Sequence, residues 1–149
     1  MRAVIQRVLS ASVEVDGAVI SSIKNGLLLL LGIHSSDTDS DIDYIISKTI
    51  GLRIFEDQNG VMNLSAAEKD YEILIVSQFT LYGDVRKGKR PSYSDAMPPD
   101  KASAFYEKFI SEFRLKYPKV KVGIFGADMK VSLVNSGPVT ILLDSSKIF

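Results

Sequence analysis

Two turn-forming dipeptides near the start of the chain restrict its fold more than any other feature. Asp16-Gly17 and Asn25-Gly26 both accept the positive φ angles of a two-residue hairpin turn. The segments on either side of them are rich in Val, Ile and Leu, as strands are. The sequence therefore predicts that the chain opens as a meander of three antiparallel strands, over residues 3–15, 18–23 and 27–33.

Two later segments show helical periodicity. Ile42, Ile45, Ile46 and Ile50 recur at helical spacing after an acidic stretch and predict a short first helix. A second helix is predicted between Pro98-Pro99 and Pro118. Its apolar stripe consists of Ala102, Phe105, Tyr106, Phe109, Ile110 and Phe113. We interpret this stripe as core packing against a sheet rather than as a ligand groove.

The rest of the chain predicts further β-structure. Strands are expected at 53–56 and 72–76, and a closing hairpin over 129–143 is expected to turn at Asn135-Ser136-Gly137-Pro138. No repeat or linker divides the 149 residues, which fit one domain. The expected fold is a single α+β domain over 1–149, with largely antiparallel, barrel-like β-sheets and two packed helices.

Composition excludes several kinds of catalytic site. Without cysteine there is no disulfide, thiolate nucleophile or zinc ribbon, and a single histidine, His34, excludes a two-histidine metal motif. We therefore expect no metal and no cofactor, and interpret His34 as a dispensable surface or strand-end residue. The equal numbers of basic and acidic residues, 18 each, leave room only for a local basic patch.

The expected location is the cytoplasm. The longest apolar stretch, Leu27 to Leu31 extended by Gly32 and Ile33, is far shorter than the roughly 18 residues of a membrane helix. The first residues lack the apolar region of a secretory signal. We expect no membrane partner.

Three segments are candidates for function. Ser77-Gln78-Phe79-Thr80 follows an apolar strand, and is either a ligand-binding strand end or a strand end whose hydroxyls bond to the local backbone. Gly137-Pro138 is either an ordinary tight turn or, with a cis peptide, a rigid backbone segment that recognises a ligand. A basic cluster is either a solvated loop or a segment that positions a phosphate-bearing substrate. It consists of Arg86, Lys87, Lys89 and Arg90.

The first two segments carry a resemblance to a known family. With Ser-Gln-Phe-Thr at 77–80 and Gly-Pro-Val-Thr at 137–140, the chain resembles the D-aminoacyl-tRNA deacylases over nearly its whole length. The resemblance implies a homodimer that hydrolyses the ester of D-aminoacyl-tRNA, and of glycyl-tRNA mischarged on tRNA-Ala, as proofreading in translation. It also implies that Gly137-Pro138 is cis and enters the active site of the other subunit, where it rejects L-aminoacyl-tRNA. No DNA partner is expected.

The resemblance implies roles for individual residues as well. Ser77, Gln78, Phe79 and Thr80 would line the catalytic pocket, with the Phe79 and Thr80 backbone N–H groups near the scissile carbonyl. Phe125 and Met129 would flank the terminal adenosine and the pocket wall, and Arg7 would brace Gly137-Pro138. The basic cluster would contact tRNA. The terminal 2′-hydroxyl of tRNA would help to activate the water, so that no side-chain base is needed.

Two alternatives stay open. Thr80 is a possible covalent nucleophile, although no histidine lies near it in sequence to activate the hydroxyl. The whole chain is alternatively a non-catalytic nucleic-acid-binding or assembly module, because a basic cluster is present and the common catalytic side chains are missing.

Overall fold

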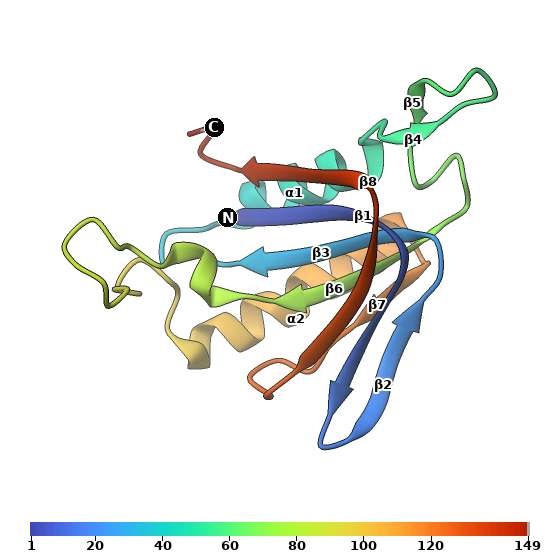
Figure 1. Cartoon of the computed structure of the whole chain (residues 1–149). Helices are drawn as coiled ribbons and strands as arrows, with labels where there is room; N and C mark the ends of the chain where they lie inside the picture. The colour runs from blue at the N-terminus through green and yellow to red at the C-terminus, as the bar shows by residue number, and fades with distance from the viewer. Residues whose placement is uncertain (149) are drawn as a thin grey trace.

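The structure is a computed structural model that describes residues 1–148, and its centre is one mixed β-sheet (Figure 1). The order of strands is β2-β1-β3-β6-β7, and β8 pairs with β1 as well. The strands are β1 (Arg2–Val15), β2 (Ala18–Ile23), β3 (Gly26–Gly32), β6 (Glu72–Ser77), β7 (Val120–Val122) and β8 (Lys130–Asp144). A separate small sheet pairs β4 (Phe55–Glu56) with β5 (Met62–Leu64).

The predicted opening meander is confirmed. β1 pairs antiparallel with both β2 and β3. Asp16 and Gly17 join β1 to β2 with φ angles of 50° and 80°, as a two-residue turn of this kind requires. β3 then pairs in parallel with β6, and β6 with β7, so the sheet is antiparallel on one side and parallel on the other.

Both predicted helices are present and cover one face of the sheet (Figure 1). α1 (Asp39–Gly51) follows a capping box in which the Thr38 backbone N–H donates to Asp41 Oδ2 at 2.7 Å. α2 (Pro99–Lys116) begins at a proline and buries the predicted stripe except Phe105, which is half-buried. Within residues 1–148, no helix has the length and apolar character needed to cross a membrane.

The core lies on both faces of the sheet. Alternate residues of β1, β3 and β6, such as Ile5, Leu29 and Ile75, pack against the two helices. The intervening residues, such as Leu28 and Leu74, belong to a second cluster on the other face. The apolar run in β3 is therefore continuous because both faces of this strand are buried.

The predicted closing hairpin is wrong. β8 is one continuous strand that lies antiparallel to β1 from the Glu14–Lys130 pair to the Arg2–Asp144 pair. Gln6 pairs with Thr140 and Val8 with Asn135, so four residues, 136–139, oppose Arg7 alone. Asn135-Ser136-Gly137-Pro138 therefore forms a bulge and does not reverse the chain. The apolar alternation is the same on both sides of a bulge, and so it could not distinguish a bulge from a turn.

We predict that Gly26→Ala destabilises the fold, because a Cβ at residue 26 would lie 2.0 Å from the backbone oxygen of Glu72. Neither backbone can yield without disturbing the β3–β6 pairing, so the free energy of unfolding should fall by about 1–3 kcal/mol. Gly51→Ala is the matched control, since a Cβ there meets nothing within 4 Å. Urea unfolding followed by circular dichroism measures both, and equal midpoints would contradict the prediction.

Candidate functional site

A mostly apolar cavity of about 630 Å³ lies at the carboxyl end of β6. Its walls come from the end of β3, the Ser77-Gln78-Phe79 segment, the start of α2 and the loop at Phe125. The first turn of α2 contributes Pro99 and Ala102. A concave apolar site with a few polar groups at its edge is typical of small-molecule binding.

The Ser77-Gln78-Phe79-Thr80 motif passes from β6 into a 3₁₀ turn, η1 (Phe79–Tyr82). The turn is anchored by the Gln78 N–H, which donates to the Leu31 carbonyl at 2.6 Å. The first bond closing the turn runs from the Leu81 N–H to the Gln78 carbonyl at 3.2 Å. The preceding N–H groups, of Phe79 and Thr80, therefore have no acceptor within the turn. Phe79 lines the cavity, whereas Thr80, the next residue of the turn, lies outside its lining.

The side chains of this motif provide no general base. Thr80 Oγ1 accepts a hydrogen bond from Gln78 Nε2, so its closest partner is an amide. His34 Nδ1 bonds instead to Ser36 Oγ at 2.8 Å, and the His34 ring lies 5.2 Å from the Tyr82 ring. Phe79 is 58% exposed, and its ring meets that of Tyr93 edge-on. The motif thus presents backbone donors and an exposed aromatic ring.

Phe125 and Met129 lie in different places. Phe125 lines the cavity, and its ring centre is 5.6 Å from that of Tyr106. Met129 packs against the second core cluster instead, next to Gly123, where an added Cβ would lie 2.6 Å from its sulfur. The structure therefore brings Phe125 to the motif at 77–80 but does not place Met129 in the cavity wall.

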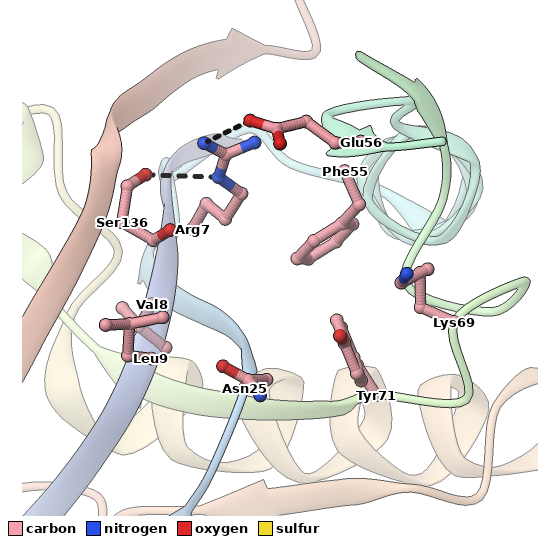
Figure 2. A pocket seen from close by; sticks show the side chains of 9 residues that line it. All are labelled: Arg7, Val8, Leu9, Asn25, Phe55, Glu56, Lys69, Tyr71 and Ser136. Atoms are coloured by element: carbon pink, nitrogen blue, oxygen red, sulfur yellow. Dashed lines mark hydrogen bonds and ion pairs between the residues drawn. The ribbon is translucent and has the colours of Figure 1, made fainter. Parts of the chain in front are cut away.

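The Gly137–Pro138 peptide bond is cis, and both residues are exposed on the β8 bulge. Figure 2 shows the buried Arg7 side chain beside this bulge. Arg7 Nε donates to the Ser136 carbonyl at 3.1 Å, and Nη1 donates to the Ile54 carbonyl at 2.7 Å. An added Cβ on Gly137 would lie 2.9 Å from Arg7 Nη2, so the bulge packs directly on the guanidinium.

The Gly137-Pro138 bulge and the large cavity are separate within one chain. In the part of the chain that the structure describes, neither residue lines that cavity. The bulge instead borders a smaller cavity of about 230 Å³, to which Arg7, Phe55, Tyr71 and Ser136 contribute (Figure 2). The two motifs of the sequence thus occupy two different places on the molecule.

The basic cluster is an exposed loop closed by the bridge between Asp84 and Ser92. Arg86 donates to both Asp84 carboxylate oxygens, at 2.9 and 2.8 Å. These hydrogen bonds from Arg86 lower the pKa of Asp84 to about 2. Among the described residues, Lys87, Lys89 and Arg90 form no ion pair. The loop begins directly after η1, which ends at Tyr82.

Sequence reasoning missed one wall of the cavity. Tyr93, Met97 and Pro98 line it, but they lie in an irregular segment without periodicity or a motif. The one sequence signal in this segment is the Pro98-Pro99 pair, which also marks the start of α2. Among residues 1–148, no group of three or more His, Asp or Glu side chains is arranged to hold a metal ion.

Known proteins match this chain over its whole length. A family model described as D-Tyr-tRNA(Tyr) deacylase matches residues 4–144. The chain is 58% identical to the D-aminoacyl-tRNA deacylase of Thermosipho africanus and 54% identical to that of Clostridium tetani, with 100% of both chains covered in each case.

Two solved structures are similar as well. The c-Myc DNA Unwinding Element Binding Protein is 46% identical, with a TM-score of 0.93 over 97% of this chain and 98% of that one. A probable eukaryotic D-amino acid tRNA deacylase is 18% identical, with a TM-score of 0.83 over 95% of this chain and 97% of that one. The second likeness concerns the fold alone.

These similarities, together with the cavity, define the class of the protein as hydrolases of the aminoacyl ester of tRNA. Within that class, the chain belongs to the D-aminoacyl-tRNA deacylase family. The expected family and the expected single-domain, barrel-like α+β fold are therefore confirmed.

Proposed function

We propose that this chain hydrolyses D-aminoacyl-tRNA to free amino acid and tRNA, and so removes D-amino acids before they reach translation in the cytoplasm. The observation that carries this proposal is the full-length similarity to deacylases in a chain whose Ser77-Gln78-Phe79 segment lines an apolar cavity. Neither a metal nor a cofactor is part of the proposed chemistry.

The backbone N–H groups of Phe79 and Thr80 are the proposed oxyanion donors. An aminoacyl ester is already activated, so the protein needs mainly to orient it, admit water and stabilise the negative charge that develops on the carbonyl oxygen. Removal of one such donor typically costs about 2.7–4 kcal/mol. The 2′-hydroxyl of the terminal ribose would help to activate the attacking water, which is the task of a side-chain base in other hydrolases. In this mechanism the cavity, with Phe125 in its wall, holds the terminal adenosine.

The chirality of the amino acid on the tRNA would be recognised by Gly137 and Pro138 of a second subunit. Two observations support this: both residues are exposed, and neither lines the cavity of its own chain among the described residues. Arg7 fixes their backbone through the Ser136 carbonyl. Fixed carbonyls next to the substrate Cα would clash with every L side chain, whatever its size. Glycine has no Cβ to reject, so glycyl-tRNA mischarged on tRNA-Ala would also be hydrolysed.

The proposed tRNA contact is local. Lys87, Lys89 and Arg90 extend from the loop that begins where η1 ends, so a phosphate bound by them would lie near the cavity edge. Such contacts position the nucleic acid without reading its sequence. Arg86 is held by Asp84 and would contribute less than the other three residues.

We predict that the protein turns over many molecules of D-aminoacyl-tRNA and leaves the matched L-aminoacyl-tRNA intact. The measurement is the release of labelled amino acid from the same tRNA charged with either enantiomer, at substoichiometric protein. Binding of both substrates without turnover would instead support the non-catalytic nucleic-acid-binding module. Equal hydrolysis of both enantiomers would contradict the proposed proofreading.

We predict that Thr80→Ala retains substantial activity, because the proposed role of residue 80 belongs to its backbone N–H. If Thr80 were a covalent nucleophile, the same change would lower kcat by roughly 10⁴-fold or more. Single-turnover hydrolysis of D-aminoacyl-tRNA separates the two cases. Thr80→Ser serves as the matched control, and thermal unfolding verifies that each variant is folded.

Pro138→Ala should weaken the rejection of L-aminoacyl-tRNA. We predict that the ratio of D to L hydrolysis falls by at least about tenfold, equivalent to about 1.4 kcal/mol of discrimination. The matched control is Pro118→Ala, which changes an exposed proline just after the end of α2. A folded Pro138→Ala protein that still refuses L-aminoacyl-tRNA completely would remove the chirality role from this residue.

A further inference from the structure

Arg2, which none of the motifs includes, contacts η1 from the start of β1. Its Nη1 donates to the Leu81 carbonyl at 3.1 Å, and its guanidinium carbon lies 4.6 Å from the centre of the Tyr82 ring. These are the last two residues of η1. A charged donor on a carbonyl forms a stronger hydrogen bond than a neutral one, and the cation over the aromatic face adds to it.

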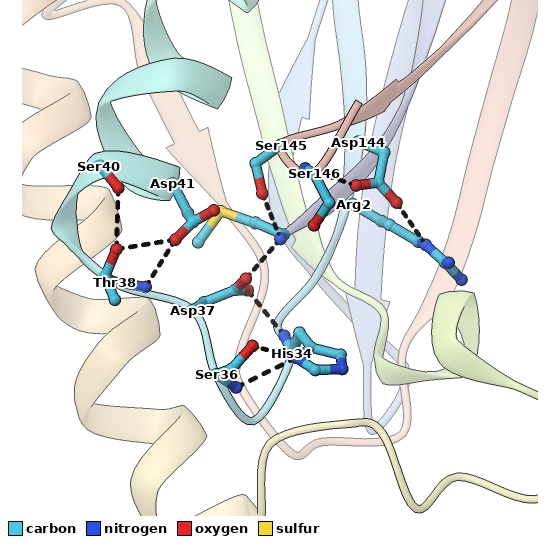
Figure 3. A network of polar contacts seen from close by, with 11 residues as sticks. Arg2, His34, Ser36, Asp37, Thr38, Ser40, Asp41, Asp144, Ser145 and Ser146 are labelled. Carbon is cyan, nitrogen blue, oxygen red and sulfur yellow. Dashed lines mark hydrogen bonds and ion pairs between the residues drawn. The ribbon is translucent and has the colours of Figure 1, made fainter. Parts of the chain in front are cut away.

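Arg2 is itself held in place by the neighbouring strand β8, in which Asp144 is its paired residue. Its Nε donates to Asp144 Oδ2 at 2.9 Å (Figure 3). Asp144 is buried, 3% exposed, and also accepts the Ser146 N–H at 2.7 Å. Because this acceptor is the last residue of β8 and is held by the Ser146 N–H just after the strand, the guanidinium has little freedom to leave Leu81.

η1 also packs closely on the backbone of β3, at Gly32, which is the residue that pairs with Arg2. An added Cβ on Gly32 would lie 3.0 Å from Leu81 Cβ and 3.1 Å from the Gln78 carbonyl oxygen. Tyr82, only 6% exposed, fills the space behind the turn. Gly32 and Arg2 are paired residues of β3 and β1, so the close packing at Gly32 and the contacts of Arg2 act on the same two residues of the turn, Leu81 and Tyr82. Neither contact involves the hydroxyls of the Ser77–Thr80 motif.

We propose that Arg2 is a positioning residue for hydrolysis: it holds η1 so that the Phe79 and Thr80 N–H groups point to the reacting carbonyl. This inference rests on the proposed function, in which those N–H groups are the oxyanion donors. Misplacement of a reacting group by about 1 Å can cost roughly 10²-fold in rate. A contact that fixes two of the four residues of η1 therefore controls the rate without touching the substrate.

The competing role for Arg2 is binding of a tRNA phosphate, since its side chain is 30% exposed. The two roles differ in kinetics. A positioning residue changes kcat and leaves KM nearly unchanged, whereas a residue that only binds substrate changes KM. They also differ without substrate, because only the positioning role predicts that η1 loosens in the free protein.

The experiment compares Arg2→Gln with Arg2→Lys in D-aminoacyl-tRNA hydrolysis and in amide hydrogen exchange. For Arg2→Gln we expect kcat to fall about 10- to 100-fold. The Gly83 N–H, which bonds to the Thr80 carbonyl, should exchange faster, while the Gly123 N–H in the β6–β7 region should not change. Arg2→Lys keeps a cation for Leu81 and Tyr82 and should recover part of kcat. Lys119→Gln, which breaks the exposed Lys119–Asp70 pair, is the matched control.

The outcomes separate this proposal from the proposed function. A raised KM with unchanged kcat overturns the positioning role and makes Arg2 a tRNA contact. Unchanged Gly83 exchange overturns it too, because Arg2 then does not hold the turn. Faster exchange with unchanged kcat also overturns it, because the Phe79 and Thr80 N–H groups then act equally well without Arg2. The proposed function fails on a different result: the wild-type protein does not turn over D-aminoacyl-tRNA.

Discussion

The antiparallel pairing of β1 with β8 is the interaction on which the rest of the structure depends. It joins the first strand of the chain to the last, from the Arg2–Asp144 pair to the Glu14–Lys130 pair. At one point along it, four residues oppose Arg7, and the Gly137-Pro138 bulge projects from the sheet. At its end, Asp144 fixes Arg2, which contacts η1. One pair of strands thus supports both segments that the proposed mechanism uses.

The remaining elements give this pair a rigid base. β3 and β6 are buried on both faces, and the turn that follows β6 is anchored to β3 through the Leu31 carbonyl. Functional groups held by a packed sheet are positioned better than groups on a free loop. The basic loop, by contrast, is exposed and begins after η1, which suits a contact that adapts to a nucleic acid.

Local patterns in the sequence predicted the elements that local forces determine. The Asp16-Gly17 turn and the α2 stripe follow from backbone preference and periodicity, and the structure contains both. The pattern around Gly137 predicted a hairpin. Alternation within 129–143 cannot reveal that β1, at the other end of the sequence, is long enough to pair with the residues on both sides of Gly137. Pairing partners are decided by packing over long distances in sequence.

The site could be predicted only in part for the same reason. Ser77, Gln78 and Phe79 lie together because they are adjacent in sequence, and Phe125 joins them at the cavity. Met129 is only four residues from Phe125, but it lies outside the cavity wall, because its side chain packs next to Gly123 and against the second core cluster. The contact between Arg2 and η1 joins residues 79 positions apart, and no motif marks it.

The lining of the large cavity has one more consequence. In the described part of the chain it contains no carboxylate, imidazole, ammonium or guanidinium group. The charged groups of a bound molecule therefore find no counter-charge in this wall, and electrostatic attraction has to act on them from outside the cavity.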